Sequence, residues 1–288
     1  MSLFDQLVDE ALKSRADLTT LRPVVEKELL HHDILRELAD AGLLARLTFI
    51  GGTCLRACYG SARLSEDLDF TGGSDFKRDQ LTELADILKS RMKTRYGLPV
   101  SVSKPVKTGG KVSTWKLTIK TRPGQKHFPP QRIHLDICAI PSHDPQPMML
   151  RNLYGVDLGT SGLILQAESR EEILADKIIA LAFRKNRVKN RDLWDLAWLV
   201  QQGIELPTKL IPLKVRDHQR EDTEFIEGLQ RRLQDLKSRP EMRSDFVKEM
   251  HRFLPAATVR NTVEAKSYWE YLMHVIEEQS MRAIAAVR

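Results

Sequence analysis

The sequence predicts an α+β protein in which a sheet-containing half, flanked by helices, precedes a helical half. Residues 46–160 contain several short runs in which apolar and polar residues alternate, as in half-buried strands. Residues 165–288 instead carry apolar residues at helical spacing. The length of 288 residues, at about 150 residues per domain, agrees with roughly two domains.

The composition excludes several classes of protein. A chain that is 42% hydrophobic is too apolar to remain disordered. Its apolar runs are too short to span a bilayer, and its first residues lack the apolar core of a signal peptide. Three cysteines (Cys54, Cys58 and Cys138) cannot form a disulfide framework. We therefore expect a cytoplasmic protein with no membrane partner.

Residues 1–45 predict N-terminal helices. Their leucines recur at helix-like spacing, and Pro23 fits the first turn of a second helix. His31 and His32 follow in that helix. Adjacent residues on a helix point about 100° apart, so the two imidazoles are poor joint metal ligands. We expect both histidines on the surface.

Residues 46–140 predict the sheet and the helices between its strands. We expect strands at about 47–50, 68–70, 100–102, 112–119 and 132–140. Thr53 is expected to cap a short helix over 55–59, and a longer helix is expected over about 77–96. The Gly109-Gly110 pair suits a hairpin between the third and fourth strands.

After Pro141 the pattern becomes helical. Residues 170–202 are predicted to form two helices and residues 220–288 several more, with breaks at Pro240 and Pro255.

The positive charge of the chain, formally +6, is unevenly distributed. Between Ile87 and Leu135 no Asp or Glu occurs, whereas twelve Lys and Arg do. They are Lys89, Arg91, Lys93, Arg95, Lys104, Lys107, Lys111, Lys116, Lys120, Arg122, Lys126 and Arg132. A second basic cluster spans residues 184–191. Such stretches attract polyanions, for example nucleic acid or nucleotide phosphates, and a merely solvated face is the alternative.

Asp67 and Asp69 are the first candidates for a functional site. Because side chains alternate along a strand, both carboxylates emerge on one face, about 7 Å apart. Two such carboxylates repel each other unless a cation lies between them, and Mg²⁺ is a hard cation that prefers oxygen ligands. Glu66 points to the opposite face and is left out of the metal site.

Two further features accompany this pair. Gly51-Gly52-Thr53 follows a strand and supplies main-chain N–H groups at the start of a helix, which suits a triphosphate. Asp136 lies in an apolar strand, where a lone carboxylate is costly to bury, so it is the expected third acid. The alternative for Asp136 is an exposed position on an edge strand.

These motifs resemble the AbiEii-type nucleotidyltransferase toxins, which belong to the polymerase-β-like nucleotidyltransferases and pair with AbiEi-type antitoxins. The resemblance rests on GGTCLR at 51–56 with RLSEDLDF at 63–70, on EEILADKIIAL at 171–181 and on RDLWDL at 191–196. It covers roughly residues 46–200. Thr53 replaces a serine of many nucleotidyltransferases and keeps the hydroxyl.

The resemblance implies a polymerase-β-like fold, a mixed sheet flanked by helices and followed by a helical C-terminal domain. It implies N-terminal helices (1–45) that pack on the catalytic domain, a catalytic sheet domain (46–160), and a helical domain (161–288) that completes the active-site cleft.

The resemblance also implies roles for individual residues. Asp67, Asp69 and Asp136 would bind Mg²⁺, with Mn²⁺ as the alternative, and would be catalytic together with Lys177 and Asp192. The nucleotide-binding set would hold the phosphates of an NTP and consists of Gly51, Gly52, Thr53, Arg56, Arg63 and Lys177. The alternative for Arg56 and Arg63 is a structural role, in which they pair with Glu66 or cap secondary-structure elements. Asp195 would orient Asp192 or pair with Arg184 or Arg191.

The implied function is that of a phage-defence toxin of a toxin–antitoxin system, which transfers NMP from an NTP to an acceptor and inhibits growth. The basic stretch favours RNA, such as a tRNA 3′ end, as the acceptor. The alternatives are transfer to a protein hydroxyl or a small molecule, and a nucleotide-binding protein without turnover. Three intact acids argue against the last.

Overall fold

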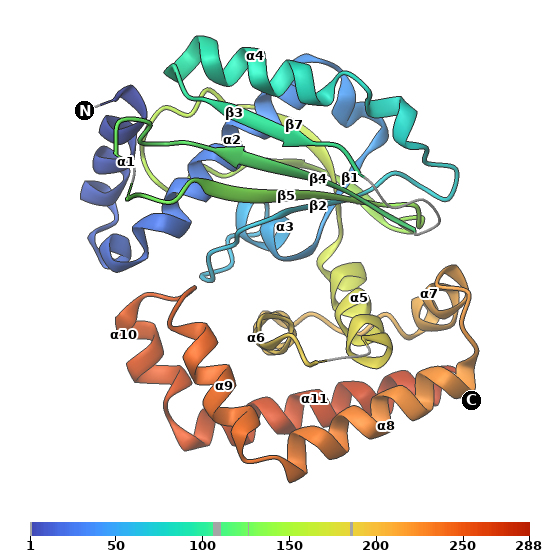
Figure 1. Cartoon of the computed structure of the whole chain (residues 1–288). Coiled ribbons are helices and arrows are strands. Elements are labelled where there is room, and N and C mark those ends of the chain that lie inside the picture. Colours follow the sequence, from blue (N-terminus) through green and yellow to red (C-terminus); the bar gives the residue numbers. More distant parts are fainter. Residues whose placement is uncertain (1, 106–110, 126, 185–186) are drawn as a thin grey trace. The chain divides into compact units, whose positions relative to one another are not determined.

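A mixed sheet organises the first of two compact units, Met1–Glu168 and Ser169–Arg288 (Figure 1). The computed structural model describes residues 2–105, 111–125, 127–184 and 187–288. Seven strands are described: Thr48–Ile50 (β1), Leu68–Thr71 (β2), Val100–Ser103 (β3), Val112–Ile119 (β4), Gln131–Cys138 (β5), Pro145–Met149 (β6) and Ile164–Glu168 (β7). Their order is β3–β4–β5–β2–β1–β7–β6. The β2–β5 and β1–β7 pairs are parallel and the other neighbours antiparallel.

One face of this sheet carries the core of the first unit. Buried apolar residues alternate along β2, β4 and β5, as in half-buried strands: Leu68, Phe70, Trp115, Leu117, Ile119, Ile133, Leu135 and Ile137. Leu135 lies beside both Leu68 and Trp115, so the three strands share one apolar layer. The intervening residues, including Asp69 and Asp136, lie on the opposite face, which we call the polar face.

The helices of the first unit are α1 (Leu3–Ser14), α2 (Arg22–Asp40), α3 (Gly51–Ala57) and α4 (Leu84–Tyr96). Short 3₁₀ segments occur at Ala16–Leu21, Leu43–Arg46 and Arg78–Leu81. α2 contacts β5, α4 contacts β3, and the two helices contact each other (Figure 1). α3 follows β1 without a loop and packs on β1 and β2.

The second unit is helical. Its helices are α5 (Arg170–Phe183), α6 (Asn190–Gln201), α7 (Ile211–Asp217), α8 (Asp222–Ser238), α9 (Glu241–Met250), α10 (Ala256–Thr258) and α11 (Lys266–Ala286), with a 3₁₀ turn at Thr208–Leu210 and a π turn at Val259–Val263. α5 packs on α6 and α8, and α11 packs on the same two helices. In the described parts of both units, no helix is long and apolar enough to cross a membrane.

The predicted α+β fold is confirmed, and so are the five predicted strands, the helices in 170–202 and the breaks at Pro240 and Pro255. Two strands were not predicted. β6 contains Pro145 and Pro147, which argue against a strand, but it lies at the edge of the sheet, where prolines are tolerated. β7 pairs with β1, so the sheet extends to Glu168.

Two local expectations change, and a third falls outside the described residues. The prediction that Thr53 caps a helix over 55–59 is wrong, because α3 begins at Gly51 and contains Thr53. The helix expected over 77–96 is continuous only from Leu84, after a 3₁₀ turn over Arg78–Leu81. The Gly109-Gly110 turn lies outside the described residues, although β3 and β4 are antiparallel neighbours.

Candidate active site

The turn between β1 and α3 brings a glycine against an acid. Gly51, the first residue of α3, has a φ of 75°. A Cβ at this position would lie 3.0 Å from Oδ2 of Asp69, which is on the neighbouring strand β2. Glycine suits this position because it accommodates both the positive φ and the close approach. The Gly51-Gly52 turn therefore lies beside the Asp69 carboxylate.

The three predicted metal ligands lie in, or directly before, the neighbouring strands β2 and β5. Asp69 and Asp136 are directly opposite each other in the parallel β2–β5 pair. Asp67 immediately precedes β2, two residues from Asp69, so strand alternation puts it on the same polar face. β5 lies between β4 and β2, so the edge-strand alternative for Asp136 is wrong. We call Asp67, Asp69 and Asp136 the carboxylate row.

His134 lies next to this row. Its main-chain N–H donates to Asp67 Oδ1 at 3.1 Å, and its ring Nδ1 lies 3.4 Å from the same oxygen. His134 is not among the predicted site residues, although it lies two residues before Asp136 in the same strand and therefore on the same face. Strand alternation alone was the signal that could have identified it.

The carboxylate row fits a divalent cation in its chemistry. Asp136 Oδ1 is buried and has no hydrogen-bond partner among the described residues, a costly state that a bound cation relieves. All three residues offer the carboxylate oxygens that Mg²⁺ prefers. No group of three or more His, Cys, Asp or Glu in the described ranges is already close enough to hold a metal ion. The side chains would have to rotate toward one another to share one.

The predicted phosphate ligand Thr53 is buried and contacts the chain itself. Its hydroxyl lies within hydrogen-bond distance of the main-chain oxygen of Asp67 and 2.7 Å from Ser65 Oγ. The structure therefore places the Thr53 side chain behind Asp67, where it holds the main chain that leads into β2.

Arg56 and Arg63 are buried as well. Nε of Arg56 lies 3.1 Å from Glu28 Oε2, and Arg63 Nη1 donates to the main-chain oxygen of Leu64 at 2.9 Å. Of the two alternatives for these arginines, this geometry favours structural pairing over phosphate contact. The partner of Arg56 is Glu28, whereas the Glu66 carboxylate pairs with a lysine of α2.

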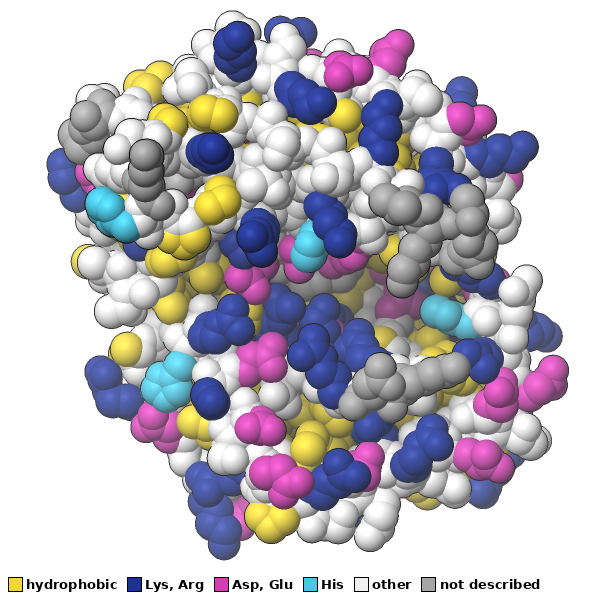
Figure 2. Space-filling view, in the orientation of Figure 1, with side chains coloured by type: hydrophobic (Ala, Val, Ile, Leu, Met, Phe, Trp, Pro, Cys, Tyr) yellow, Lys and Arg dark blue, Asp and Glu magenta, His cyan; other side chains and the backbone are white. Residues whose placement is uncertain are grey.

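The acid-free stretch is partly neutralised by another segment of the chain. Three of its arginines pair with acids of α1 and α2: Arg91 with Glu37, Arg95 with Asp33, and Arg122 with Asp5 and Glu26. In Figure 2, acidic side chains lie among the Lys and Arg side chains on the visible face of the molecule. These three arginines are therefore paired within the chain, which makes them weaker candidates for binding a polyanion.

Other cations of the stretch remain exposed beside the carboxylate row. Lys116 on β4 lies opposite His134, and Arg132 on β5 is one alternation further along the polar face. Lys120 directly follows β4 and is also exposed. We call Lys116, Lys120 and Arg132 the basic strip. Lys107, Lys126 and Lys185 lie outside the described residues.

Lys177, on α5 of the second unit, is buried against acids of α6. Its Nζ lies 2.6 Å from Asp192 Oδ1 and 2.8 Å from Asp195 Oδ2. Arg184 Nη1 lies 2.8 Å from the other oxygen of Asp192. The described partner of Arg184 is thus Asp192, and Asp195 contacts Lys177. We call these four residues the α5–α6 network.

Asp192 is ionised inside this network. Burial opposes the ionisation of its carboxyl group, but the positive charges of Lys177, Lys189 and Arg184 outweigh burial and hold the pKa of Asp192 well below its usual range. The carboxylate is therefore compensated by cations of the same unit.

Lys214, from the segment after the quoted motifs, supports the same helix. Its Nζ is buried and lies 2.5 Å from Glu172 and 2.6 Å from Asp176 on α5. Lys214 is not among the predicted residues, because nothing in the local pattern of α7 links this lysine to α5.

The prediction that His31 and His32 lie on the surface is wrong. Their side chains are 2% and 5% exposed, and burial lowers the pKa of each to about 4. His31 Nε2 lies 3.0 Å from the main-chain oxygen of Glu66, and His32 Nδ1 lies 2.9 Å from Thr160 Oγ1. The spacing of apolar residues could not predict this burial, because α2 buries polar residues among its leucines.

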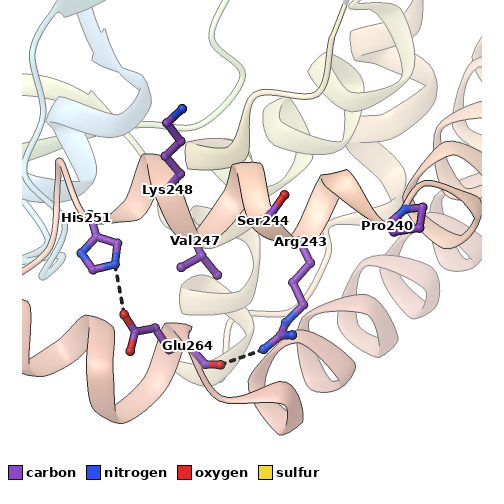
Figure 3. Close-up of a pocket in the computed structure, with 7 residues that line it drawn as sticks. All are labelled: Pro240, Arg243, Ser244, Val247, Lys248, His251 and Glu264. Carbon is purple, nitrogen blue, oxygen red and sulfur yellow. Dashed lines mark hydrogen bonds and ion pairs between the residues drawn. The ribbon is translucent and has the colours of Figure 1, made fainter.

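A separate hollow of about 540 Å³ runs along α9 (Figure 3). It is lined by Pro240, Arg243, Ser244, Val247, Lys248, His251 and Glu264. His251 and Arg243 both contact Glu264, through its carboxylate and its main-chain oxygen (Figure 3). No predicted site residue lines this hollow.

Comparisons with known proteins agree with the motifs. Residues 33–273 match the family described as nucleotidyl transferase AbiEii toxin of type IV toxin–antitoxin systems. The structure resembles the nucleotidyltransferase toxin MenT4 from Mycobacterium tuberculosis, with a TM-score of 0.54 and 16% identity over 99% of both chains.

The structure also resembles JHP933 from Helicobacter pylori, with a TM-score of 0.50 and 17% identity over 90% of this chain and 93% of that one. These likenesses confirm the fold. None of the curated proteins matches the sequence. Because the family match spans most of the chain and contains all the motifs quoted above, the protein belongs to the AbiEii nucleotidyltransferase toxin family of type IV toxin–antitoxin systems.

Proposed function

We propose that this nucleotidyltransferase transfers the NMP part of an NTP to an RNA acceptor, such as the 3′ end of a tRNA, in a Mg²⁺- or Mn²⁺-dependent reaction in the cytoplasm. A hydroxyl of the acceptor attacks the α-phosphate and loses its proton to water, a phosphodiester bond forms, and the bond between the α-phosphorus and the bridging oxygen breaks as pyrophosphate leaves. The transfer inhibits growth, and an AbiEi-type antitoxin counteracts it. The observation that carries the proposal is the carboxylate row beside the basic strip on the polar face of the sheet.

In this proposal Asp67, Asp69 and Asp136 hold the divalent metal. The metal would neutralise the charge of the triphosphate and of the leaving pyrophosphate. The Gly51-Gly52 turn would lie against the phosphates. Because these two glycines have no side chains, phosphates can approach the main chain beside the Asp69 carboxylate. Thr53 would contribute by holding the main chain of Asp67.

We assign Lys177 to the phosphates of the nucleotide. Its buried ammonium is held by Asp192 and Asp195, which fixes its position before any ligand binds. Asp192 and Asp195 would act as positioning residues for this charge. In this proposal residues 46–160 are the catalytic domain that provides the metal ligands, and residues 1–45 are its supporting helices.

The basic strip would bind the phosphates of the acceptor. Lys116, Lys120 and Arg132 are exposed, whereas Arg122 of the same acid-free stretch is neutralised by Asp5 and Glu26. Exposed cations on the face that carries the carboxylate row favour a polyanionic acceptor over an uncharged or cationic one.

Incubation of the protein with each labelled NTP in turn, Mg²⁺ and deproteinised tRNA tests the reaction. We expect label from one or more NTPs to enter RNA, and we expect the transfer to disappear with EDTA and in the Asp69→Asn variant. Label that enters only protein or a small molecule would exclude RNA as the acceptor.

Binding of RNA at rising salt concentrations tests the acceptor surface. Each of Lys116→Gln, Lys120→Gln and Arg132→Gln should weaken binding and reduce the salt slope by about 1. Arg122→Gln is the matched control from the same stretch and should leave the slope unchanged. RNA affinity that does not depend on salt would contradict an acceptor role for the basic strip.

A further inference from the structure

The main chain that precedes β2 is held at three successive residues by side chains from two helices. The Ser65 N–H donates to Glu28 Oε1 of α2 at 2.9 Å. The Glu66 carbonyl lies 3.0 Å from His31 Nε2, also of α2, and the Asp67 carbonyl accepts from Thr53 of α3. We call Ser65–Asp67 the lead-in segment. Asp67 belongs to the carboxylate row. The position of the lead-in segment therefore determines the position of the Asp67 main chain, from which its carboxylate extends.

His31 contacts this segment as a hydrogen-bond donor. Burial keeps its imidazole neutral at pH 7, with a pKa of about 4. A carbonyl oxygen only accepts hydrogen bonds, so Nε2 must carry the proton. Nδ1 is buried and has no hydrogen-bond partner among the described residues. The hydrogen bond from Nε2 is therefore the one hydrogen bond that this ring makes among the described residues, and it joins the ring to the main chain directly before Asp67.

We propose that His31, through its Nε2–H bond to the Glu66 carbonyl, is a positioning residue that sets the Asp67 carboxylate for metal binding. The inference rests on the proposed metal site. Residue 31 also precedes the residues that match the family, which begin at 33, so the family match assigns it nothing.

Glu28 supports the same segment but is a poorer test. Its buried carboxylate also contacts Arg56 and the hydroxyl of Tyr154. Removing it would leave the Arg56 guanidinium buried without its partner, which destabilises a protein strongly. A change at Glu28 would therefore mix unfolding with misplacement of Asp67.

His32 provides the matched control. It is the next residue of the same helix, it is equally buried, and burial lowers its pKa to the same value of about 4. Its ring contacts Thr160 instead of the lead-in segment. Loss of either imidazole should affect stability similarly, whereas only loss of His31 should affect Asp67.

The test measures Mn²⁺ affinity by calorimetry, NTP-dependent transfer and thermal melting for the full chain and its variants. For His31→Leu we expect Mn²⁺ affinity and kcat each to fall by about 10-fold, as for other residues that orient metal ligands. His31→Gln restores an N–H donor of similar reach and should recover most of both. His32→Leu should lower the melting temperature like His31→Leu but keep Mn²⁺ affinity and kcat.

Equal Mn²⁺ affinity in His31→Leu and His32→Leu would overturn the inference. If His31→Leu does not fold, His31→Met replaces it, because methionine fills the site without an N–H. Asp67→Ala tests the proposed metal site independently of the role of His31. Wild-type Mn²⁺ affinity in Asp67→Ala would overturn the proposed metal site and this inference with it. Lost affinity in Asp67→Ala with unchanged affinity in His31→Leu would overturn the inference alone.

Discussion

The carboxylate row of the first unit and the α5–α6 network of the second unit both gather aspartates, but they balance the charge differently. In the network, Lys177 and Arg184 lie within 2.8 Å of aspartate oxygens, and Asp192 stays ionised despite its burial. In the row, Asp69 and Asp136 lie opposite each other on neighbouring strands, and a buried oxygen of Asp136 lacks a hydrogen-bond partner among the described residues.

This difference indicates how each cluster contributes. The α5–α6 network is complete without a ligand, so its charges support the fold of the second unit and fix Lys177. The carboxylate row brings like charges together and gains most from a cation added from solution. Substitutions should therefore separate function from stability in the row and combine them in the network.

The largest effect is expected in the carboxylate row. Asp136→Asn should reduce nucleotidyl transfer by about 100-fold or more, because a lost metal ligand removes several kcal/mol of transition-state stabilisation. Its melting temperature without metal should stay the same or rise, since one of two repelling charges is gone. Transfer assays and thermal melting measure the two effects, with Asp75→Asn at an exposed turn as the control. Full activity of Asp136→Asn would contradict the assignment.

In the network the same kind of change should destabilise the protein. Lys177→Met leaves Asp192 and Asp195 buried without their shared cation, and we expect the free energy of unfolding to fall by about 3–5 kcal/mol. Transfer activity should be lost as well. Lys177→Arg should recover only part of both, since a planar guanidinium does not replace a compact ammonium. Denaturant titration measures the stability. A Lys177→Met variant as stable as the wild type would contradict the stabilising role of the α5–α6 network.

The buried histidines of α2 predict that stability depends on pH, independently of the carboxylate row and the α5–α6 network. Each has a pKa of about 4 in the folded state against 6.5 when exposed, so the unfolded state binds more protons between these values. Stability is therefore full above about pH 6.5 and falls toward pH 4, by about 3 kcal/mol for each histidine. Melting curves from pH 7 to 4 check this, and His32→Asn should flatten the dependence.

The smallest effect concerns the glycine beside the row. Gly51→Ala places a Cβ at a φ of 75° and 3.0 Å from Asp69 Oδ2, which should lower stability by about 1–2 kcal/mol. Because the methyl group also displaces the Asp69 carboxylate, transfer should fall by more than this loss of stability explains. Gly124→Ala, where a Cβ would meet nothing within 4 Å, is the control. Similar behaviour of the two variants would contradict the close approach.

Much of the fold could be predicted because its signals are local. Strand alternation identified β2, β4 and β5, and helical spacing with Pro240 and Pro255 divided the second unit. The missed strands β6 and β7 lacked such signals: β6 carries two prolines, and β7 is recognised by its pairing with β1. The predicted helix cap at Thr53 is wrong because the Thr53 hydroxyl contacts the main chain of Asp67, fourteen positions later, instead of the start of the helix.

The sequence by itself determined the identity of the acids, their common face and the family, because a period of two residues and a contiguous motif are properties of neighbouring positions. The tertiary structure decided what those residues contact. It set Asp69 opposite Asp136, paired Arg122 with Asp5 and Glu26, and buried His31 against Glu66. Each of these contacts joins segments far apart in the chain, so it depends on which elements pack together and not on local spacing.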